Sequence, residues 1–317
     1  MKKVLCAVLA IVMIFSLCAC GQSKAKDTFT VGICQLVQHT ALDAATKGFK
    51  DVLTETFGDK VTFDEANASG DIPTCATICN GFVSNSVDLI MANATPALQA
   101  AAAATDKIPI LGTSVTEYGV ALSIDGFSGT VGGNISGTSD LAPLDEQANM
   151  IADLFPDAKV CGILYCSAEA NSQYQVTVVK AALEAKGLTV EVFPFADSND
   201  LNPVAVTACD TVDVLFVPTD NTAASCAEAI DAVARAAGVP IIAGEENVCV
   251  TCGVATLSID YYDLGRTTGE MAVKILKGEA DISAMPIEYF PNPVKKYNPE
   301  LAELYNVTIP SDFVAIG

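Results

Sequence analysis

The sequence predicts an α/β protein built from two doubly wound domains that several connecting strands join. Short apolar runs alternate with stretches whose apolar residues recur at helical spacing, which is typical of parallel sheets covered by helices. This alternation is interrupted once and then restarts, which indicates two domains rather than one. The chain has 317 residues, 51% of them hydrophobic, and that is enough for two cores of ordinary size.

Residues 31–48 form the first of these repeating units. Val31 and Ile33 indicate a buried strand, and residues 35–39 form the polar loop that follows it. Residues 40–43, Thr-Ala-Leu-Asp, match a helix-capping pattern, and apolar residues at helical spacing follow. Such a turn places loop side chains and free helix N–H groups at the carboxyl end of a strand, where open α/β sheets bind their ligands.

The rest of the first α/β segment, up to residue 140, follows the same alternation of strands and helices. A Gly- and Ser-rich stretch, residues 126–140, contains no clear element, and we interpret it as a crossover between domains. The pattern predicts strands at 61–63, 87–91 and 108–111, and helices at 71–82 and from Pro96 to 104.

The second α/β segment extends from residue 159 to the end of the chain. The pattern predicts strands at 159–165, 189–193, 212–217, 239–243 and 254–259, and helices at 172–186, around Val204, from 218–222 to 237, and at 260–278. The tail contains a strand-like segment at 287–290, a helix at 299–305 and an irregular end.

These two α/β segments predict two domains. The N-terminal domain comprises residues 28–135 and 260–288, and the C-terminal domain comprises residues 136–259 and 289–317. The carboxyl ends of strands from both domains would then line a central cleft between them. This arrangement is typical of a clamshell that closes on a small ligand by hinge motion.

The N-terminus has the features of an export signal. Lys2 and Lys3 precede an apolar stretch, residues 4–15, that is too short to span a bilayer as an ordinary helix. The sequence Leu-Cys-Ala-Cys-Gly at 17–21 resembles the bacterial lipobox, which implies a signal peptide of residues 1–19, lipidation of Cys20, and a polar tether at residues 20–27. The alternative is an ordinary secretory signal with an incidental cysteine.

The net charge of the chain excludes one class of partner. The whole chain carries −21, and removal of residues 1–19 leaves 15 basic and 38 acidic residues, or −23. A surface this acidic repels nucleic-acid phosphates and anionic lipid headgroups, and the sequence contains no basic cluster. We therefore expect no nucleic-acid partner and a membrane link through acyl chains alone.

Nine of the twelve cysteines lie beyond Cys20, and an odd number cannot all form disulfides with one another. Cys34, Cys161 and Cys209 lie among apolar residues and are interpreted as small core residues. The pairs Cys75/Cys79 and Cys249/Cys252 have spacings found in zinc and redox sites, but the cysteines are scattered and no thioredoxin-like context surrounds them. We expect no metal and no cofactor.

Five segments together resemble one known family, the ABC-type substrate-binding lipoproteins that take up tryptophan and other aromatic amino acids. These segments are residues 31–51, 92–99, 164–172, 217–225 and 258–265, and they span essentially the whole mature chain in order. The resemblance implies the type I periplasmic-binding-protein fold, an extracytoplasmic location at the cell membrane, a monomer, and an ABC permease and ATPase as partners. It also implies an aromatic amino acid as the ligand.

An amino acid is a zwitterion, and both of its charges must be matched in the cleft. Thr95, Ser114 and Thr116 lie on N-domain loops, where their hydroxyls and nearby backbone N–H groups could bind the carboxylate. Helix capping and turn formation are the alternative roles of these residues. On the facing domain, the loop candidates are Ser167, Asn171 and Ser172, of which the last two could equally cap the next helix.

Asp220 is the candidate for the ligand ammonium, because it follows a buried strand and stands in a polar loop with Asn221. Its alternative role is that of an ordinary N-cap aspartate. Asp260 is a further candidate, although an aspartate before Tyr-Tyr at a helix start is typical of a cap.

The first loop supplies the remaining candidates. His39, the only histidine, has no nucleophile or carboxylate partner identifiable from the sequence, so we expect it to line the cleft with Gln35 or to cap the helix rather than to catalyse. Leu36, Val37 and Tyr165 could form an apolar wall for an aromatic ring, or belong to the core.

The sequence also bears on functions other than the binding of an aromatic amino acid for transport. An enzyme is disfavoured because the sequence lacks G-x-S-x-G, the P-loop signature, G-x-G-x-x-G and H-E-x-x-H. A transcription regulator is excluded by the signal peptide and the lack of an N-terminal helix-turn-helix. A receptor that passes a signal to a membrane sensor, or a binder of another small polar solute, stays open.

Overall fold

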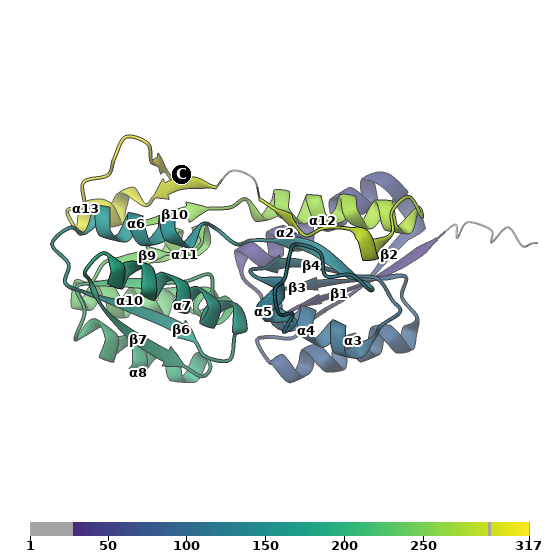
Figure 1. The fold of residues 1–317 in the computed structure, drawn as a ribbon, viewed down its shortest axis with the longest axis horizontal. Helices are drawn as coiled ribbons and strands as arrows, with labels where there is room; N and C mark the ends of the chain where they lie inside the picture. The colour runs from purple at the N-terminus through teal and green to yellow at the C-terminus, as the bar shows by residue number, and fades with distance from the viewer. Residues whose placement is uncertain (1–27, 291–292, 317) are drawn as a thin grey trace, which may run out of the picture.

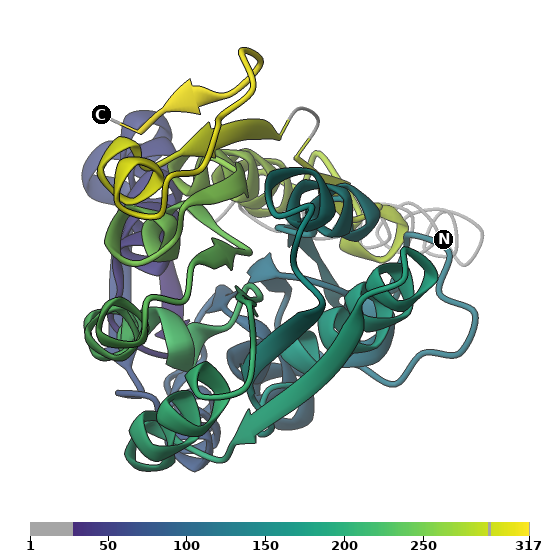
Figure 2. The same cartoon turned by 90° about the vertical axis from the view of Figure 1, so that its left-hand side faces the viewer.

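The computed structural model describes residues 28–290 and 293–316, which fold into two lobes side by side (Figure 1). Figure 2 views the molecule along its long axis with the C-terminal lobe in front. The export signal, Cys20 and the tether lie outside the described residues.

The first lobe, called here the N-lobe, is built on a parallel six-stranded sheet in the order β11-β5-β4-β3-β1-β2. Helices α2 and α12 cover one face of this sheet, and α3 and α4 cover the other (Figure 1). Its elements are β1 (Phe29–Gln35), α2 (Thr40–Phe57), η1 (Gly58–Lys60), β2 (Val61–Asn67), α3 (Ile72–Asn85), β3 (Leu89–Asn93), α4 (Thr95–Ala104), β4 (Ile110–Val115), α5 (Tyr118–Ala121), β5 (Ile135–Ser139), α12 (Tyr261–Leu276), η2 (Ile282–Ala284) and β11 (Glu288–Tyr289).

The second lobe, the C-lobe, has a seven-stranded sheet in the order β13-β12-β10-β9-β8-β6-β7, in which only the β10–β12 pair is antiparallel. One apolar layer packs α8, α10 and α11 on the sheet, and the other packs α6 and α7. Its elements are α6 (Leu144–Leu154), β6 (Val160–Cys166), α7 (Ala170–Ala185), β7 (Thr189–Phe195), α8 (Ser198–Cys209), β8 (Val214–Val217), α9 (Asn221–Ser225), α10 (Ala227–Ala237), β9 (Ile241–Ala243), α11 (Glu246–Thr251), β10 (Ala255–Ser258), β12 (Val294–Tyr297), α13 (Pro299–Leu304) and β13 (Val314–Ala315).

The chain crosses between the lobes three times, after β5, after β10, and between β11 and β12. The predicted fold class, two doubly wound domains joined by a multi-strand hinge, is confirmed. The predicted alternation misses some elements, among them α6 and α11, and it merges α9 and α10 into one helix.

The predicted crossover at 126–140 is wrong in part, because it contains β5, which pairs with β4 in the N-lobe sheet. The predicted domain boundary after residue 135 therefore falls inside a strand. β5 is hard to detect because it is polar but buried: the Ser136 hydroxyl donates to Met285 O at 3.1 Å, and the Thr138 hydroxyl lies 2.8 Å from that of Thr268. Hydrogen-bonded hydroxyls let a polar strand occupy an interior position.

None of the helices within residues 28–290 and 293–316 combines the length and the apolar character that crossing a membrane requires.

The two helices on the hinge side of the N-lobe, α2 and α12, cross in direct backbone contact. A Cβ atom on Gly265 would lie 2.0 Å from Ala45 O, and one on Gly48 would lie 2.1 Å from Tyr262 O. Glycine is required at both positions because any side chain would separate the helices. This contact fixes α12, and with it the chain that leaves the second crossover.

We predict that Gly265→Ala lowers the free energy of unfolding by about 1–3 kcal/mol, because the added methyl group forces α2 and α12 apart. The melting temperature should fall by about 2–4 °C for each kcal/mol. Gly81→Ala is the matched control, since Gly81 is an exposed helical residue whose Cβ would meet nothing within 4 Å. Equal melting temperatures for Gly265→Ala and the wild type would contradict the close crossing.

Candidate functional site

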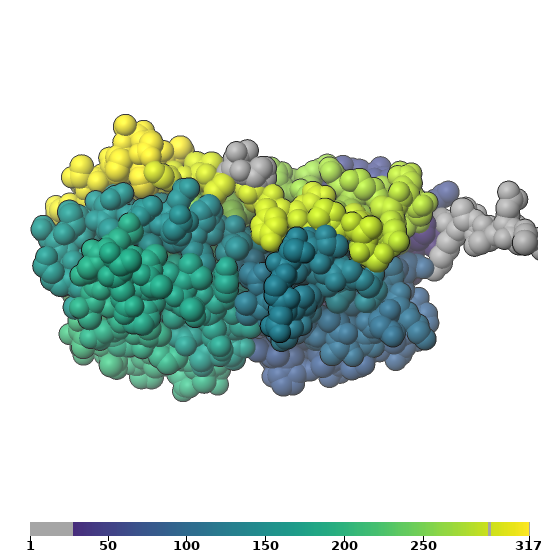
Figure 3. Space-filling model, viewed as in Figure 1, coloured from purple at the N-terminus to yellow at the C-terminus, as the bar shows by residue number. Residues whose placement is uncertain are grey.

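The carboxyl ends of strands from both sheets meet between the lobes. The N-lobe contributes the loops after β1, β3 and β4, and the C-lobe contributes those after β6 and β8. One hydrogen bond links the two sides directly, from His39 Nε2 to Asn221 Oδ1 at 3.5 Å. The space-filling view shows the two lobes in contact along their boundary (Figure 3).

The N-lobe side carries hydroxyl groups that are buried without partners. Thr95 and Ser114 are 1% and 4% exposed, and neither hydroxyl forms a hydrogen bond within the described part of the chain. The backbone beside them is strained, with φ of 90° at Ala94 and 54° at Ser114. Non-glycine residues with positive φ cost about 1–3 kcal/mol and cluster at functional sites. The loops after β3 and β4 therefore combine two features of a binding site.

Asp220 anchors the C-lobe side of the site. Its Oδ1 accepts from Ala223 N at 2.8 Å, which caps α9, and its Oδ2 accepts from Cys166 N at 2.6 Å. The carboxylate thus has the alternative capping role. Burial, reinforced by the neighbouring Glu169 carboxylate, raises the pKa of Asp220 to about 7.

Asn171 and Ser172 stand beside this aspartate, both buried in the first turn of α7. Asn171 Nδ2 donates to Glu169, to the Ser172 hydroxyl and to Thr219 O at 3.1–3.2 Å. Its Oδ1 has no hydrogen-bond partner among the described residues. The predicted pair therefore leaves one buried acceptor free on this side of the site.

Glu169 is a site residue that the sequence analysis did not identify. It is 1% exposed, and its Oε1 accepts from Thr222 N and from the Thr222 hydroxyl at 2.9 and 2.8 Å. Its Oε2 accepts from Asn221 N and Nδ2 at 3.1 and 2.6 Å. This carboxylate ties the loop after β6 to the start of α9 and fixes the orientation of the Asn221 amide. The sequence gives no signal for it, because its partners lie 52–53 residues away.

A second unpredicted carboxylate lies on the hinge. Asp140 follows β5 on the first crossover and accepts at 2.9 Å from the hydroxyl of Tyr261, which follows the second crossover. Both residues are buried, so this bond ties two hinge segments together. Burial raises the pKa of Asp140 to about 6, although the hydrogen bond from the Tyr261 hydroxyl acts to lower it. The predicted Thr116 is also buried, and its hydroxyl has no hydrogen-bond partner among the described residues.

The buried charges of the described residues are all negative. Asp140, Glu169, Asp220 and Glu245 are at most 3% exposed, and no lysine or arginine is buried with them. Buried carboxylates are costly unless they are hydrogen-bonded or paired with a positive charge. The arrangement therefore favours a ligand that carries a positive group.

Three predicted residues do not join this site. Gln35 lies on the same side of β1 as Ile33 and faces α2, where Nε2 donates to Asp43 and Oε1 accepts from Thr46. Ser167 is tied to the end of β7 through its N–H and hydroxyl, both of which donate to Phe195 O. Asp260 is exposed, and its carboxylate caps α12 by accepting from Asp263 N.

The predicted apolar wall is present in part. Leu36 and Val37, together with Ile72 and Pro73, line a cavity of about 280 Å³ whose opposite wall includes Cys166, Ala168 and Glu169 of the C-lobe. Tyr165 packs instead with the apolar layer under α6 and α7, because neighbouring strand residues face opposite sides of the sheet.

The nine described cysteines are free, and eight of them are buried. Cys34 on β1 packs in one apolar core with Cys75 and Cys79 of α3, so Cys34 is a core residue as predicted. Cys249 and Cys252 belong to the apolar layer of the C-lobe. No cluster of metal-binding side chains occurs in residues 28–290 and 293–316.

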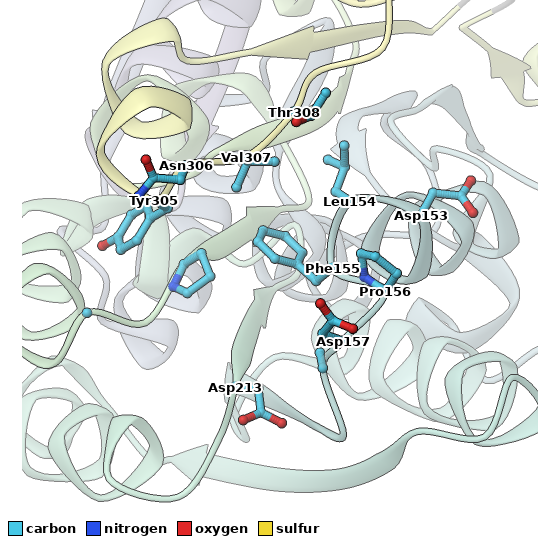
Figure 4. Close-up of a pocket in the computed structure, with 13 residues that line it drawn as sticks. Asp153, Leu154, Phe155, Pro156, Asp157, Asp213, Tyr305, Asn306, Val307 and Thr308 are labelled. Carbon is cyan, nitrogen blue, oxygen red and sulfur yellow. The ribbon is translucent and has the colours of Figure 1, made fainter.

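A larger cavity, about 610 Å³, lies elsewhere in the C-lobe (Figure 4). It opens at the amino ends of β8 and β9, beside Asp213 and Pro240, and contains none of the predicted residues. Asp213 is already engaged there, since its carboxylate accepts from the N–H groups of Lys159 and Val160. The interlobe site therefore remains the functional candidate.

Comparison with known proteins agrees with this geometry. The sequence profile of the ABC transporter substrate binding protein family matches residues 30–315. The "Tyrosine-binding protein" of Clostridioides difficile strain R20291 is 37% identical over 265 residues, which cover 82% of this chain and 76% of that protein.

Two solved structures are similar in fold and sequence. The ABC domain from Streptococcus pneumoniae in complex with L-Trp has a TM-score of 0.85 at 34% identity and covers 90% of this chain and 96% of that one. The ligand-free, open structure of a substrate-binding protein with adhesive properties from Clostridium difficile has a TM-score of 0.68 at the same identity, covering 91% and 99%. At equal identity, this chain is more similar in structure to the L-Trp complex than to the ligand-free, open structure.

The two-lobe fold, the interlobe site and the profile that spans both lobes lead to one conclusion: the chain belongs to the ABC transporter substrate-binding protein family.

Proposed function

We propose that the protein binds an aromatic L-amino acid between its lobes and delivers it to an ABC permease. This proposal rests on the buried polar groups between the lobes. Some are neutral groups without a hydrogen-bond partner, and the others are carboxylates with no buried cation beside them. A small zwitterion would satisfy both at once, because its carboxylate accepts hydrogen bonds and its ammonium supplies the missing positive charge.

The two charged groups of the ligand would bind to opposite lobes. The Thr95 and Ser114 hydroxyls would donate to the ligand carboxylate, close to the N-terminus of α4. Asp220 and Asn171 Oδ1 would accept from the ligand ammonium. A ligand held in this way contacts both lobes, so its binding energy favours the closed form.

The aromatic class is supported by the cavity and by the relatives. Leu36, Val37, Ile72 and Pro73 give the interlobe cavity an apolar surface, and Glu169 lines the same cavity. The names of the relatives refer to tyrosine and to L-Trp, both of which have an aromatic side chain. A sugar would leave the carboxylates without a positive partner.

The remaining parts of the proposal concern location and partners. We expect export, cleavage before Cys20, lipid attachment to its sulfur, and action as a monomer outside the cytoplasm. Transport is favoured over catalysis by the match to the ABC transporter substrate-binding protein family. A role as a ligand sensor uses the same site, and neighbouring permease and ATPase genes would distinguish transport from it.

A thermal-shift screen of the purified protein tests the ligand class. We expect L-tyrosine, L-tryptophan or L-phenylalanine, supplied at about a hundred times its dissociation constant, to stabilise the protein by about 2.7 kcal/mol. The melting temperature should then rise by about 5–10 °C. Other amino acids, nucleosides and sugars serve as controls, and a shift with a sugar but with no amino acid would overturn the proposal.

Thr95→Val tests the carboxylate contact. Loss of a hydrogen bond to a charged group should weaken amino-acid binding by about 10–100-fold in calorimetry. The unliganded protein should be no less stable, because the removed hydroxyl has no partner.

Thr113→Val is the matched control. The Thr113 hydroxyl is paired at 3.2 Å with that of Thr138, so its loss should cost about 1 kcal/mol of stability and leave affinity unchanged. The reverse pattern, with a destabilised Thr95→Val that binds normally, would make Thr95 a structural residue.

The raised pKa of Asp220 predicts that affinity depends on pH. Below a pH of about 7 this carboxyl is protonated in the unliganded protein, and it must release its proton before it can pair with the ammonium. Affinity should therefore fall by up to about tenfold for each pH unit between 7 and 5.

Calorimetry at pH 5, 6, 7 and 8 measures this slope. Asp220→Asn should bind weakly with a flat profile, and Asp140→Asn should keep the wild-type slope. A slope that Asp140→Asn abolishes and Asp220→Asn retains would place the ammonium at the hinge instead.

A further inference from the structure

The imidazole of His39 joins the lobes through one nitrogen and leaves the other without a partner. Nε2 lies 3.5 Å from Asn221 Oδ1 across the boundary. Nδ1 is buried and forms no hydrogen bond with any described residue, although His39 occupies the N-cap position of α2. A buried polar atom of this kind calls for a partner.

The surrounding hydrogen bonds determine which nitrogen carries the proton. The Asn221 amide is oriented by Glu169, which accepts from Asn221 Nδ2 at 2.6 Å and is itself held by Thr222. Asn221 therefore turns Oδ1, which can only accept, toward His39. Nε2 must donate in this pair, so in the neutral ring Nδ1 is the lone-pair acceptor.

His39 follows β1, a strand separated from the predicted carboxylate contact at Ser114. In the N-lobe sheet β1 lies two strands from β4, with β3 between them, and Ser114 belongs to β4. Strand spacing places the carboxyl ends of β1 and β4 about 10 Å apart, comparable with the length of an aromatic amino acid from its carboxylate to the edge of its ring. His39 also follows Leu36 and Val37, which line the interlobe cavity.

We propose that His39 Nδ1 accepts a hydrogen bond from a donor on the aromatic ring of the ligand, the phenol O–H or the indole N–H. His39 is then the residue that selects tyrosine and tryptophan against phenylalanine, which has no ring donor. Phenylalanine would leave Nδ1 buried and unpaired. Because an unpaired buried polar group costs free energy, the site would bind phenylalanine more weakly than tyrosine or tryptophan. This inference rests on the proposed binding of aromatic amino acids.

Calorimetry with L-tyrosine and L-phenylalanine tests the proposal on the wild type, on His39→Phe and on Gln38→Ala. We expect the wild type to bind tyrosine about 10–100-fold more tightly than phenylalanine. In His39→Phe this ratio should collapse toward one through loss of tyrosine affinity, and in Gln38→Ala, an exposed neighbour, it should persist. A ratio near one in the wild type, or an unchanged ratio in His39→Phe, would overturn the proposal.

An equal loss of tyrosine and phenylalanine affinity in His39→Phe would also overturn the proposal. His39 would then contribute to lobe closure or contact the ligand ammonium, and would not contact the ring donor. Failure of every amino acid to bind would instead refute the proposed function itself.

A second measurement needs no variant, because His39 is the only histidine of the chain. The ¹⁵N resonances of its ring should report a neutral Nε2–H tautomer in the unliganded protein. Tyrosine or tryptophan should shift the Nδ1 resonance in the direction expected for an accepted hydrogen bond, and phenylalanine should not. A protonated Nδ1 in the unliganded protein, or the same shift with all three ligands, would contradict the assignment.

Discussion

The interlobe site is governed by the cost of burying polar groups without partners. Thr95, Ser114, Asn171 and His39 each bury a polar atom that forms no hydrogen bond within the described chain. Asp220 and Glu169 add negative charge in the same region, with no buried cation near them. Each such group costs about 1–3 kcal/mol when it is left unsatisfied. A closed form with these groups facing one another is therefore poised to gain stability from a ligand that satisfies them.

The scaffold positions these groups through contacts between segments that are distant in sequence. Glu169 holds the loop after β6 against the start of α9, and Asp140 with Tyr261 joins two of the hinge crossovers. Backbone contact between α2 and α12 ties the second crossover to the N-lobe. Residues distant in sequence are thus fixed relative to one another within each lobe, which closure by hinge motion requires.

The sequence was sufficient for the fold class and for most of the strands and helices, because apolar periodicity records which faces are buried. It failed at β5, where buried hydroxyls replace apolar side chains, and at Gln35, whose position two residues after Ile33 already places it on the α2 side. Thr95, Ser114, Asn171 and Asp220 stay predictions of ligand contacts, which rest on the convergence of strand ends in an α/β sheet. Glu169 and Asp140 were missed because their roles depend on partners 52 and 121 residues away.

Small-angle X-ray scattering of the purified protein, with and without L-tyrosine or L-tryptophan at saturating concentration, tests the central claim most directly. If the ligand supplies the missing partners of both lobes, its addition should reduce the radius of gyration, and the liganded profile should fit the closed structure. The Thr95→Val variant, compared at the same ligand concentration, should contract less. Scattering that does not change, under conditions where calorimetry shows the amino acid to be bound, would contradict the account.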